Sequence, residues 1–221
     1  MTVNSYVFVD LLSDLAKPDD IIVTDMGYAF QCTHQAWKVK KGQRLMTNCG
    51  LAPMGWGLPA AIGACLGSGR RTLCIVGDGG LMINIQELAT IMHHQLPIKI
   101  FLLENGGYLT IKQTQELGFE GRLMGVNEDT GLSFPNFAKI AEAYGIGYAG
   151  TKQHKFLKMH LEHVLESKGP YLLELQMARD QPQAPRAVNR RNPDGTMNPT
   201  KLEDAYPFLD PAEVMENMRI E

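Results

Sequence analysis

The chain lacks the features that mark membrane, secreted and nucleic-acid-binding proteins. No apolar run approaches the ~20 residues that a membrane-spanning helix needs. Residues 1–6 carry neither the basic segment nor the apolar core of a signal peptide. A net charge of −3 offers no basic surface to nucleic acid or to an acidic membrane. We therefore expect a cytoplasmic protein that binds neither nucleic acid nor a membrane.

Cysteine is also scarce and shows no metal-binding pattern. The 4 cysteines, Cys32, Cys49, Cys65 and Cys74, form no Cys-x-x-Cys pair. This spacing favours a reduced compartment over a disulfide framework or an iron–sulfur cluster. What the chain does have is an ordinary globular composition, with 44% hydrophobic and 20% charged residues among 221. We expect one sizeable domain with an appendage.

Short apolar runs alternate with segments of helical periodicity. Strands are predicted at residues 21–24, 44–47, 72–76, 97–103, 146–149 and 171–176. Helices are predicted at residues 6–16, around Gln35 and Trp37, before Cys65, and at residues 83–93, 108–116, 134–144 (with a Ser133 cap and Pro135 in the first turn), and 152–167. This alternation predicts an α/β fold, with a doubly wound, mostly parallel six-stranded sheet and helices on both faces.

Residues 179–221 differ in composition from residues 1–178. Half of the chain's 12 prolines lie in this segment, together with Arg186, Arg190 and Arg191. We expect an extended, proline-rich tail that wraps a neighbour or covers a site and ends in a short helix from Pro211.

One stretch places polar groups at the ends of two neighbouring strands. Asp78 follows the strand predicted at residues 72–76, and Asn105 follows the strand predicted at residues 97–103. In an open α/β sheet, ligands bind outside these carboxyl ends. A carboxylate and an amide oxygen suit a hard divalent cation that bridges to phosphate. The glycines around Asp78 bare N–H groups that suit the phosphate itself, so the sequence predicts a metal and phosphate site.

Gly77-Asp78-Gly79, followed by Asn105 after a helix and a strand, resembles the thiamine-diphosphate signature of the 2-oxo-acid decarboxylase and acetolactate-synthase superfamily. The resemblance covers about residues 1–180 and only the diphosphate-binding (PP) domain. It implies that Asp78, Asn105 and the carbonyl of Gly107 bind Mg²⁺. The other cofactor contacts that it implies are Gly27, Tyr28, Gly50, Gly77, Gly79, Gly80 and Tyr108.

The segment from Gly50 to Ala64 is similar to the family block GLGTMGFGLPAAIGA. By this resemblance Met54 would wedge thiamine diphosphate into its bent shape. The carbonyl of Ala52 would accept a hydrogen bond from the amine of the aminopyrimidine. A methionine without this context would be read as core packing.

The chain departs from the acetolactate-synthase pattern at several positions. Thr110 and Thr114 stand where those enzymes have Met and Trp, so with Ile111 they would line a more open and polar substrate pocket. Tyr28 stands where they have Gln, which leaves backbone contacts to the diphosphate. Glu104 replaces the usual Asn before Asn105. Because adjacent side chains on a strand point to opposite faces, Glu104 is open to three interpretations: solvent, the substrate pocket or a partner chain.

The resemblance implies a thiamine-diphosphate-dependent lyase or transferase. The expected reaction is decarboxylation of a 2-oxo acid and transfer of the acyl unit to a carbonyl acceptor. The alternative is a two-chain decarboxylase of the phosphonopyruvate or sulfopyruvate type, because the turn Asn105–Tyr108 is similar to its NGxY motif. A non-catalytic assembly subunit is a third possibility, although the intact Asp78 and Asn105 pair argues against it.

The length of the chain bears on its partners. In the superfamily a Glu on a separate pyrimidine domain activates the cofactor, and 221 residues do not contain such a domain. We therefore expect a hetero-oligomer, in which a pyrimidine-domain partner supplies this Glu and without which the chain is inactive. An excised domain of a longer chain is the other explanation, and the start at Met1–Tyr6 mildly favours a natural subunit.

Overall fold

The computed structural model describes residues 2–192, 194–199 and 201–219, in two compact units, Met1–Gln181 and Pro182–Glu221. The sequence placed the boundary between residues 178 and 179. Gln181 is buried in the first unit, where its side-chain oxygen accepts a hydrogen bond from the backbone N–H of Ser5 at 2.9 Å. This contact with the N-terminal helix places Gln181 with the first unit.

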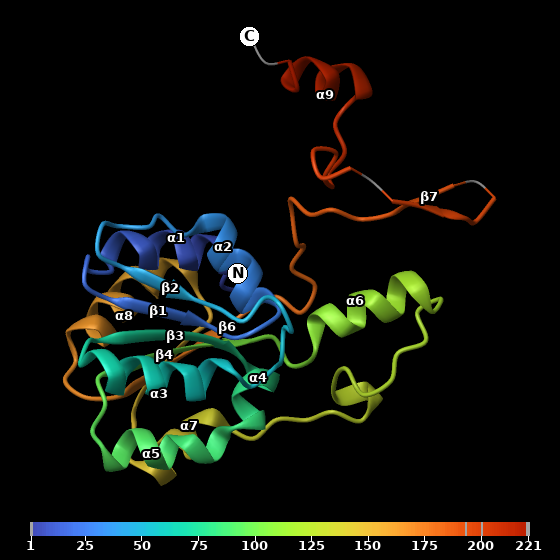
Figure 1. Cartoon of the computed structure of the whole chain (residues 1–221). Helices are drawn as coiled ribbons and strands as arrows, with labels where there is room; N and C mark the ends of the chain where they lie inside the picture. Colours follow the sequence, from blue (N-terminus) through green and yellow to red (C-terminus); the bar gives the residue numbers. More distant parts are fainter. Residues whose placement is uncertain (1, 193, 200, 220–221) are drawn as a thin grey trace. The chain divides into compact units, whose positions relative to one another are not determined.

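The first unit contains a six-stranded parallel sheet in the order β2-β1-β3-β4-β6-β5 (Figure 1). The strands are β1 (Ile21–Thr24), β2 (Arg44–Met46), β3 (Thr72–Gly77), β4 (Ile98–Glu104), β5 (Gly147–Thr151) and β6 (Tyr171–Gln176). The predicted fold class and the six predicted strands are confirmed, with shifts of one or two residues at the ends.

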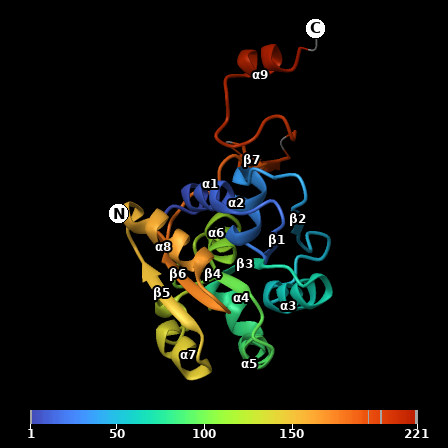
Figure 2. The ribbon, with the colours of Figure 1, turned by 90° about the vertical axis from the view of Figure 1, so that its left-hand side faces the viewer.

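Helices cover both faces of this sheet (Figures 1 and 2). One layer contains α1 (Ser5–Leu15), α2 (Tyr28–Ala36) and α8 (His154–Glu166), and the other contains α3 (Gly57–Ser68), α5 (Leu88–His93) and α7 (Phe137–Tyr144). In β4, Phe101 and Leu103 belong to the first core, whereas Ile100 and Leu102 belong to the second. A strand buried on both faces reads as a continuous apolar run, and each buried side chain stabilises the fold by ~1.5–3 kcal/mol.

The strand order of the sheet changes side at β1. From β1 the chain moves to β2 on one side and then returns to β3 on the other side. Accordingly α2, which follows β1, packs into one core, while α4 (Asp78–Ile83), which follows β3, packs into the other. A crevice outside the carboxyl ends of the strands is expected at such a switch point.

Two predicted helix starts were wrong. The helix predicted from Ile83 begins at Asp78 as α4, breaks at Asn84, and continues through a short 3-10 helix (Ile85–Glu87) into α5. Two glycines in its first turn hid this start, because glycine has a low helix propensity. The Ser133 cap and the Pro135 first turn were also wrong, since α7 begins at Phe137. There the Asn136 side chain accepts a hydrogen bond from Lys139 N at 3.0 Å, as N-cap residues do.

Helix α6 (Leu109–Gly118) lies close to its predicted range, and a short 3-10 helix (Glu128–Thr130) follows it. The second unit contains a hairpin, β7 (Arg190–Arg191) with β8 (Met197–Asn198), and the helix α9 (Pro211–Asn217). The helix from Pro211 is confirmed and the hairpin was not predicted. In the described part of the chain no helix is long and apolar enough to cross a membrane.

Candidate functional site

A cavity of about 430 Å³ lies at the carboxyl ends of β1, β3 and β4, at the switch point of the sheet. The predicted site residues that line it are Gly27, Tyr28, Ala52, Met54, Gly77, Asp78, Gly79, Gly80, Asn105, Gly107, Tyr108, Thr110 and Ile111. Gly50 and Thr114 are not part of this lining and are exposed. We call this space the switch-point cavity.

Asp78 lies at the centre of a set of backbone donors. One carboxylate oxygen, Oδ2, accepts hydrogen bonds from the N–H groups of Asn105 (3.0 Å), Gly106 (2.8 Å) and Gly107 (3.3 Å). The other oxygen accepts from Gly79 N at 2.7 Å. The side chain is only 2% exposed, and burial raises the pKa of its carboxyl group to about 6 although these hydrogen bonds oppose the shift. The end of β3 is thereby tied to the turn after β4.

Gly107 allows the turn after β4 to contact a second loop. A Cβ atom at this position would overlap the carbonyl oxygen of Val126. The same oxygen accepts a hydrogen bond from Tyr108 N at 2.9 Å, and Gly107 forms an isolated bridge with Asn127. The turn that carries Asn105 is therefore fixed on two sides, by Asp78 and by the loop at residues 126–127.

Gly79 admits two side chains to the first turn of α4. A Cβ atom on Gly79 would overlap the ring of Tyr108 and would lie 3.2 Å from Cε of Met54. Tyr108 and Met54 therefore meet at this glycine, on the wall of the switch-point cavity. The Gly79 N–H, predicted to bind a diphosphate, here donates to Asp78.

Gly27 and Tyr28 begin α2 at the opposite wall. Gly27 is the N-cap residue and has φ +70°, a value that favours glycine. The side chain of Thr110 lies 3.9 Å from the position of a Cβ on Gly27, so α6 faces this loop. The Tyr28 hydroxyl donates to the carbonyl of Gln181 and accepts from Gln113 Nε2 at 2.9 Å. With its hydroxyl bound there, Tyr28 offers mainly its backbone to a cavity ligand.

Asp25 is a site residue that sequence reasoning passed over. It follows β1 directly, is 1% exposed and lines the switch-point cavity. Its Oδ2 atom accepts a hydrogen bond from Gly55 N at 3.0 Å, and burial raises the pKa of its carboxyl group. The available signal was its position, because Asp25 directly follows a buried strand, as Asp78 does, and lies two residues before Gly27.

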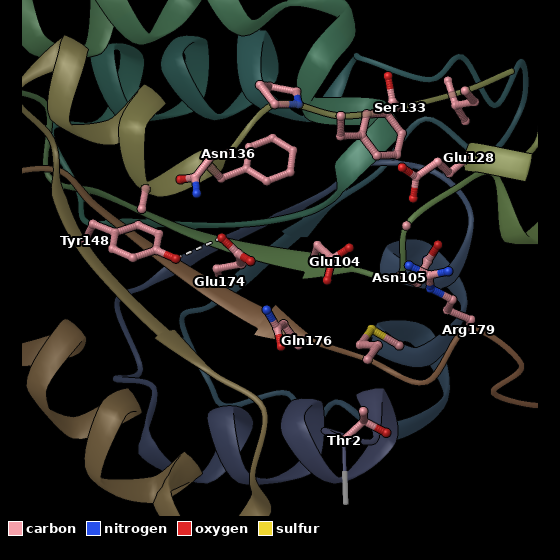
Figure 3. Close-up of a pocket in the computed structure, with 17 residues that line it drawn as sticks. Thr2, Glu104, Asn105, Glu128, Ser133, Asn136, Tyr148, Glu174, Gln176 and Arg179 are labelled. Atoms are coloured by element: carbon pink, nitrogen blue, oxygen red, sulfur yellow. Dashed lines mark hydrogen bonds between the residues drawn. The ribbon is translucent and has the colours of Figure 1, made fainter.

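Glu104 faces a different cavity, of about 600 Å³, beside the ends of β4 and β6 and next to Tyr148 of β5 (Figure 3). It lines this strand-end cavity together with Glu174 and Tyr148, whose hydroxyl donates to Glu174 Oε2 at 2.8 Å. Burial and the charge of Glu174 raise the pKa of the Glu104 carboxyl group, while Arg179 opposes the shift. Glu104 was open to three interpretations: solvent, the substrate pocket or a partner chain. This orientation does not favour the substrate pocket, because Glu104 does not line the switch-point cavity.

The oxygen atoms of the switch-point cavity fit the predicted metal and cofactor. Asp78 and Asn105 supply a carboxylate and an amide at the ends of adjacent paired strands, a donor set suited to Mg²⁺. Among the described residues no three His, Cys, Asp or Glu side chains gather as a metal cluster. A metal here would therefore depend on mixed side-chain, backbone and phosphate oxygens.

Comparison with known proteins gives the class to which this fold and cavity belong. Residues 25–175 match the family model described as "Thiamine pyrophosphate enzyme, C-terminal TPP binding domain". The chain therefore belongs to the thiamine pyrophosphate enzyme family through this domain. The predicted resemblance is confirmed.

The relatives within this family include several acetolactate synthases. The chain is 37% identical over 172 residues to acetolactate synthase isozyme 2 large subunit of Escherichia coli (strain K12), covering 75% of this chain and 30% of the relative. It is 36% identical over 169 residues to acetolactate synthase of Arthrospira platensis, covering 74% and 28% respectively. The chain thus spans less than a third of the length of these relatives.

Proposed function

We propose that this chain is the diphosphate- and Mg²⁺-binding part of an acetolactate-synthase-like enzyme that decarboxylates a 2-oxo acid and transfers the acyl unit to a carbonyl acceptor. The observation that carries this proposal is the meeting of Asp78, Asn105 and Met54 at one cavity on the switch point of the sheet. The similarity to acetolactate synthases supports the reaction class.

In this proposal the residues of the chain bind and shape the cofactor. Asp78, the Asn105 side chain and the Gly107 carbonyl hold Mg²⁺. The backbone of Gly27, Tyr28 and Gly80 receives the diphosphate near the N-terminus of α4, where helix N–H groups favour an anion, while the Gly79 N–H stays bound to Asp78. Met54 and the Ala52 carbonyl orient the thiamine rings. Thiamine diphosphate supplies the carbanion chemistry when bound.

A partner completes the site in this proposal. The pyrimidine-domain Glu that activates the cofactor comes from another chain or from the rest of a longer protein, because this chain covers 30% or less of the two relatives described. The lone chain is expected to bind thiamine diphosphate without releasing CO₂.

A simple two-chain decarboxylase of the phosphonopyruvate or sulfopyruvate type is the second candidate. It is favoured by the turn from Asn105 to Tyr108, with its NGxY pattern, and by the polar Thr110 on the cavity wall. Analysis of the products of the assembled enzyme separates the two reactions, because carboligation consumes an acceptor and forms a larger acid.

Calorimetric titration of the chain with thiamine diphosphate and Mg²⁺ tests the binding proposal. We expect saturable binding that needs Mg²⁺ and is lost in Asp78→Ala. The matched control is Asp19→Ala, which removes an exposed carboxylate before β1 and should leave the affinity unchanged. Equal affinity in wild type and Asp78→Ala would refute the metal assignment.

The assembly is tested with co-purified partners and a panel of 2-oxo acids. CO₂ release is expected only in the presence of the partner. Release by the lone chain at the rate of the complex would refute the two-part site.

A further inference from the structure

Gly55 is buried in the loop that carries Ala52 and Met54, between β2 and α3. Its φ of +83° favours glycine. A Cβ atom on Gly55 would lie 2.6 Å from Cγ2 of Ile83 and 3.1 Å from Nδ2 of Asn84. The loop is therefore pressed against the end of α4 at this residue.

Both polar groups of Gly55 are bound by side chains from distant segments. Its N–H donates to Asp25 Oδ2 at 3.0 Å, and its carbonyl accepts from Asn84 Nδ2 at 2.7 Å. Asp25 follows β1 and Asn84 ends α4, so the two tethers come from opposite sides of the switch point. We call Asp25 and Asn84 the Gly55 clamp.

Asp25 is held tightly in this arrangement. A Cβ atom on Gly57 would lie 2.8 Å from Cβ of Asp25, and one on Gly80 would overlap the carboxylate. Its second oxygen, Oδ1, has no hydrogen-bond partner among the described residues. A buried carboxyl group with one unpaired oxygen costs stability, which an apolar side chain packed there would avoid.

The loop also contains backbone strain beside the clamp. Ala52 has φ +49°, a left-handed conformation that costs a residue with a side chain ~1–3 kcal/mol and persists only when its surroundings hold it. Met54, next to Gly55, reaches Gly79 in the first turn of α4. The position of both residues at the cavity therefore depends on what holds the loop.

We propose that Asp25 and Asn84 are positioning residues that clamp the Gly55 peptide and so hold Ala52 and Met54 at the cavity in the geometry that binds the thiamine rings. This inference rests on the proposed function, because Ala52 and Met54 are the residues assigned to those rings. Neither clamp residue needs to touch the cofactor. Asn84 acts through Gly55, and Asp25 acts through Gly55 and the neighbouring backbone N–H groups of Trp56 and Gly57, which oppose the rise in the pKa of its carboxyl group.

Trp56 provides a spectroscopic test of the clamp. It follows Gly55 directly and is half-buried, and the chain has 2 tryptophans. The test uses the full chain with Trp37→Phe, so that Trp56 alone reports the loop by acrylamide quenching. In this background Asp25→Ala and Asn84→Ala are compared with the conservative Asp25→Asn, whose amide oxygen still accepts from Gly55 N.

Asp25→Ala should raise the Trp56 quenching constant about twofold. It should also weaken thiamine diphosphate binding about tenfold, as expected for the loss of one hydrogen bond that holds the loop. Asn84→Ala should give the same changes at about half this size. Asp25→Asn should restore both readouts to within about twofold of the Trp37→Phe parent. A purely structural role would lower the melting temperature without this paired change and rescue.

Unchanged quenching in Asp25→Ala and Asn84→Ala would overturn the clamp. If Asp25→Ala does not fold, Asn84→Ala decides alone, because Asn84 is only half-buried. Asp78→Ala separates this inference from the proposed function, since it should weaken cofactor binding about 100-fold and leave Trp56 quenching unchanged. If the parent chain binds no thiamine diphosphate, the proposed function fails and the quenching series still decides whether the clamp exists.

Discussion

The two cavities at the carboxyl edge of the sheet hold their acidic groups in different ways. In the switch-point cavity, Asp25 and Asp78 are 1% and 2% exposed and accept hydrogen bonds from backbone N–H groups. In the strand-end cavity, Glu104 and Glu174 are half-buried. Glu174 accepts a hydrogen bond from the Tyr148 hydroxyl, and Glu104 lies near the charges of Glu174 and Arg179 and the backbone N–H of Gly106.

This difference bears on what each cavity can bind. A backbone N–H has a fixed direction, so Asp78 is held in one geometry, which a metal ligand requires. Long side chains adjust to one another, and the half-buried groups at the strand-end cavity already have partners there. The same sheet edge thus contains one preorganised site and one adaptable polar surface.

The largest expected effect tests this comparison at the proposed metal ligands. Asp78→Ala should weaken binding of thiamine diphosphate with Mg²⁺ about 100-fold, because the proposed carboxylate ligand to the metal is lost. Glu104→Ala removes a carboxylate at the end of β4 that lines the other cavity, and it should change the affinity less than about twofold. Calorimetry measures both, and equal losses in the two variants would erase the distinction between the cavities.

The second effect concerns pH. The folded-state pKa of Asp78, about 6, lies above the ordinary value of 3.8, so between these pH values the folded chain binds more protons than the unfolded chain. The contribution of Asp78 to the stability of the chain should therefore fall by ~3 kcal/mol as pH rises through this range. Asp78→Asn should remove this dependence.

Urea unfolding of wild type and Asp78→Asn between pH 4 and pH 7 isolates the contribution of Asp78, because other groups titrate equally in both. The stability difference between the two proteins should change with pH. A stability difference that does not change with pH would show that burial does not raise the pKa of Asp78. Binding of Mg²⁺ and the cofactor should reduce the stability cost of burying the Asp78 carboxylate, and this reduction should be largest near pH 7.

Much of this architecture could be predicted from the sequence because it follows from periodicity. The strands β1 and β6 have the predicted ends, and Asp78 and Asn105 lie at neighbouring strand ends as expected. The Gly55 clamp could not be predicted in this way. Periodicity describes which face a residue takes on its own element, whereas Asp25 and Asn84 meet Gly55 from segments about 30 residues away on either side.

The orientation of Glu104 was closer to being predictable. It lies two residues after Leu102 and therefore shares its face of β4. Leu102 belongs to the core that contains α5 and α7, so the alternation places Glu104 at the end of that face. Assigning Leu102 to a core required the packing of the helices, which the sequence alone left open.

A third prediction compares two glycines. Gly79→Ala should destabilise the chain by ~1–3 kcal/mol and weaken cofactor binding, because the new Cβ overlaps the Tyr108 ring. Gly63→Ala, in α3 with no atom within 4 Å of the new Cβ, should stabilise the chain by ~0.5–1 kcal/mol. Thermal unfolding measures both, and a stabilising Gly79→Ala would show that Tyr108 moves away freely.

The smallest expected effect concerns a hydrogen bond in the strand-end cavity. Tyr148→Phe removes the hydroxyl that donates to Glu174 at 2.8 Å and should cost ~1 kcal/mol of stability. Cofactor affinity should stay unchanged, since Tyr148 does not line the switch-point cavity. Chemical unfolding and calorimetry on the same samples give the two values. A loss of affinity in Tyr148→Phe would mean that the two cavities are coupled through the turn at Asn105, which contributes to the lining of both.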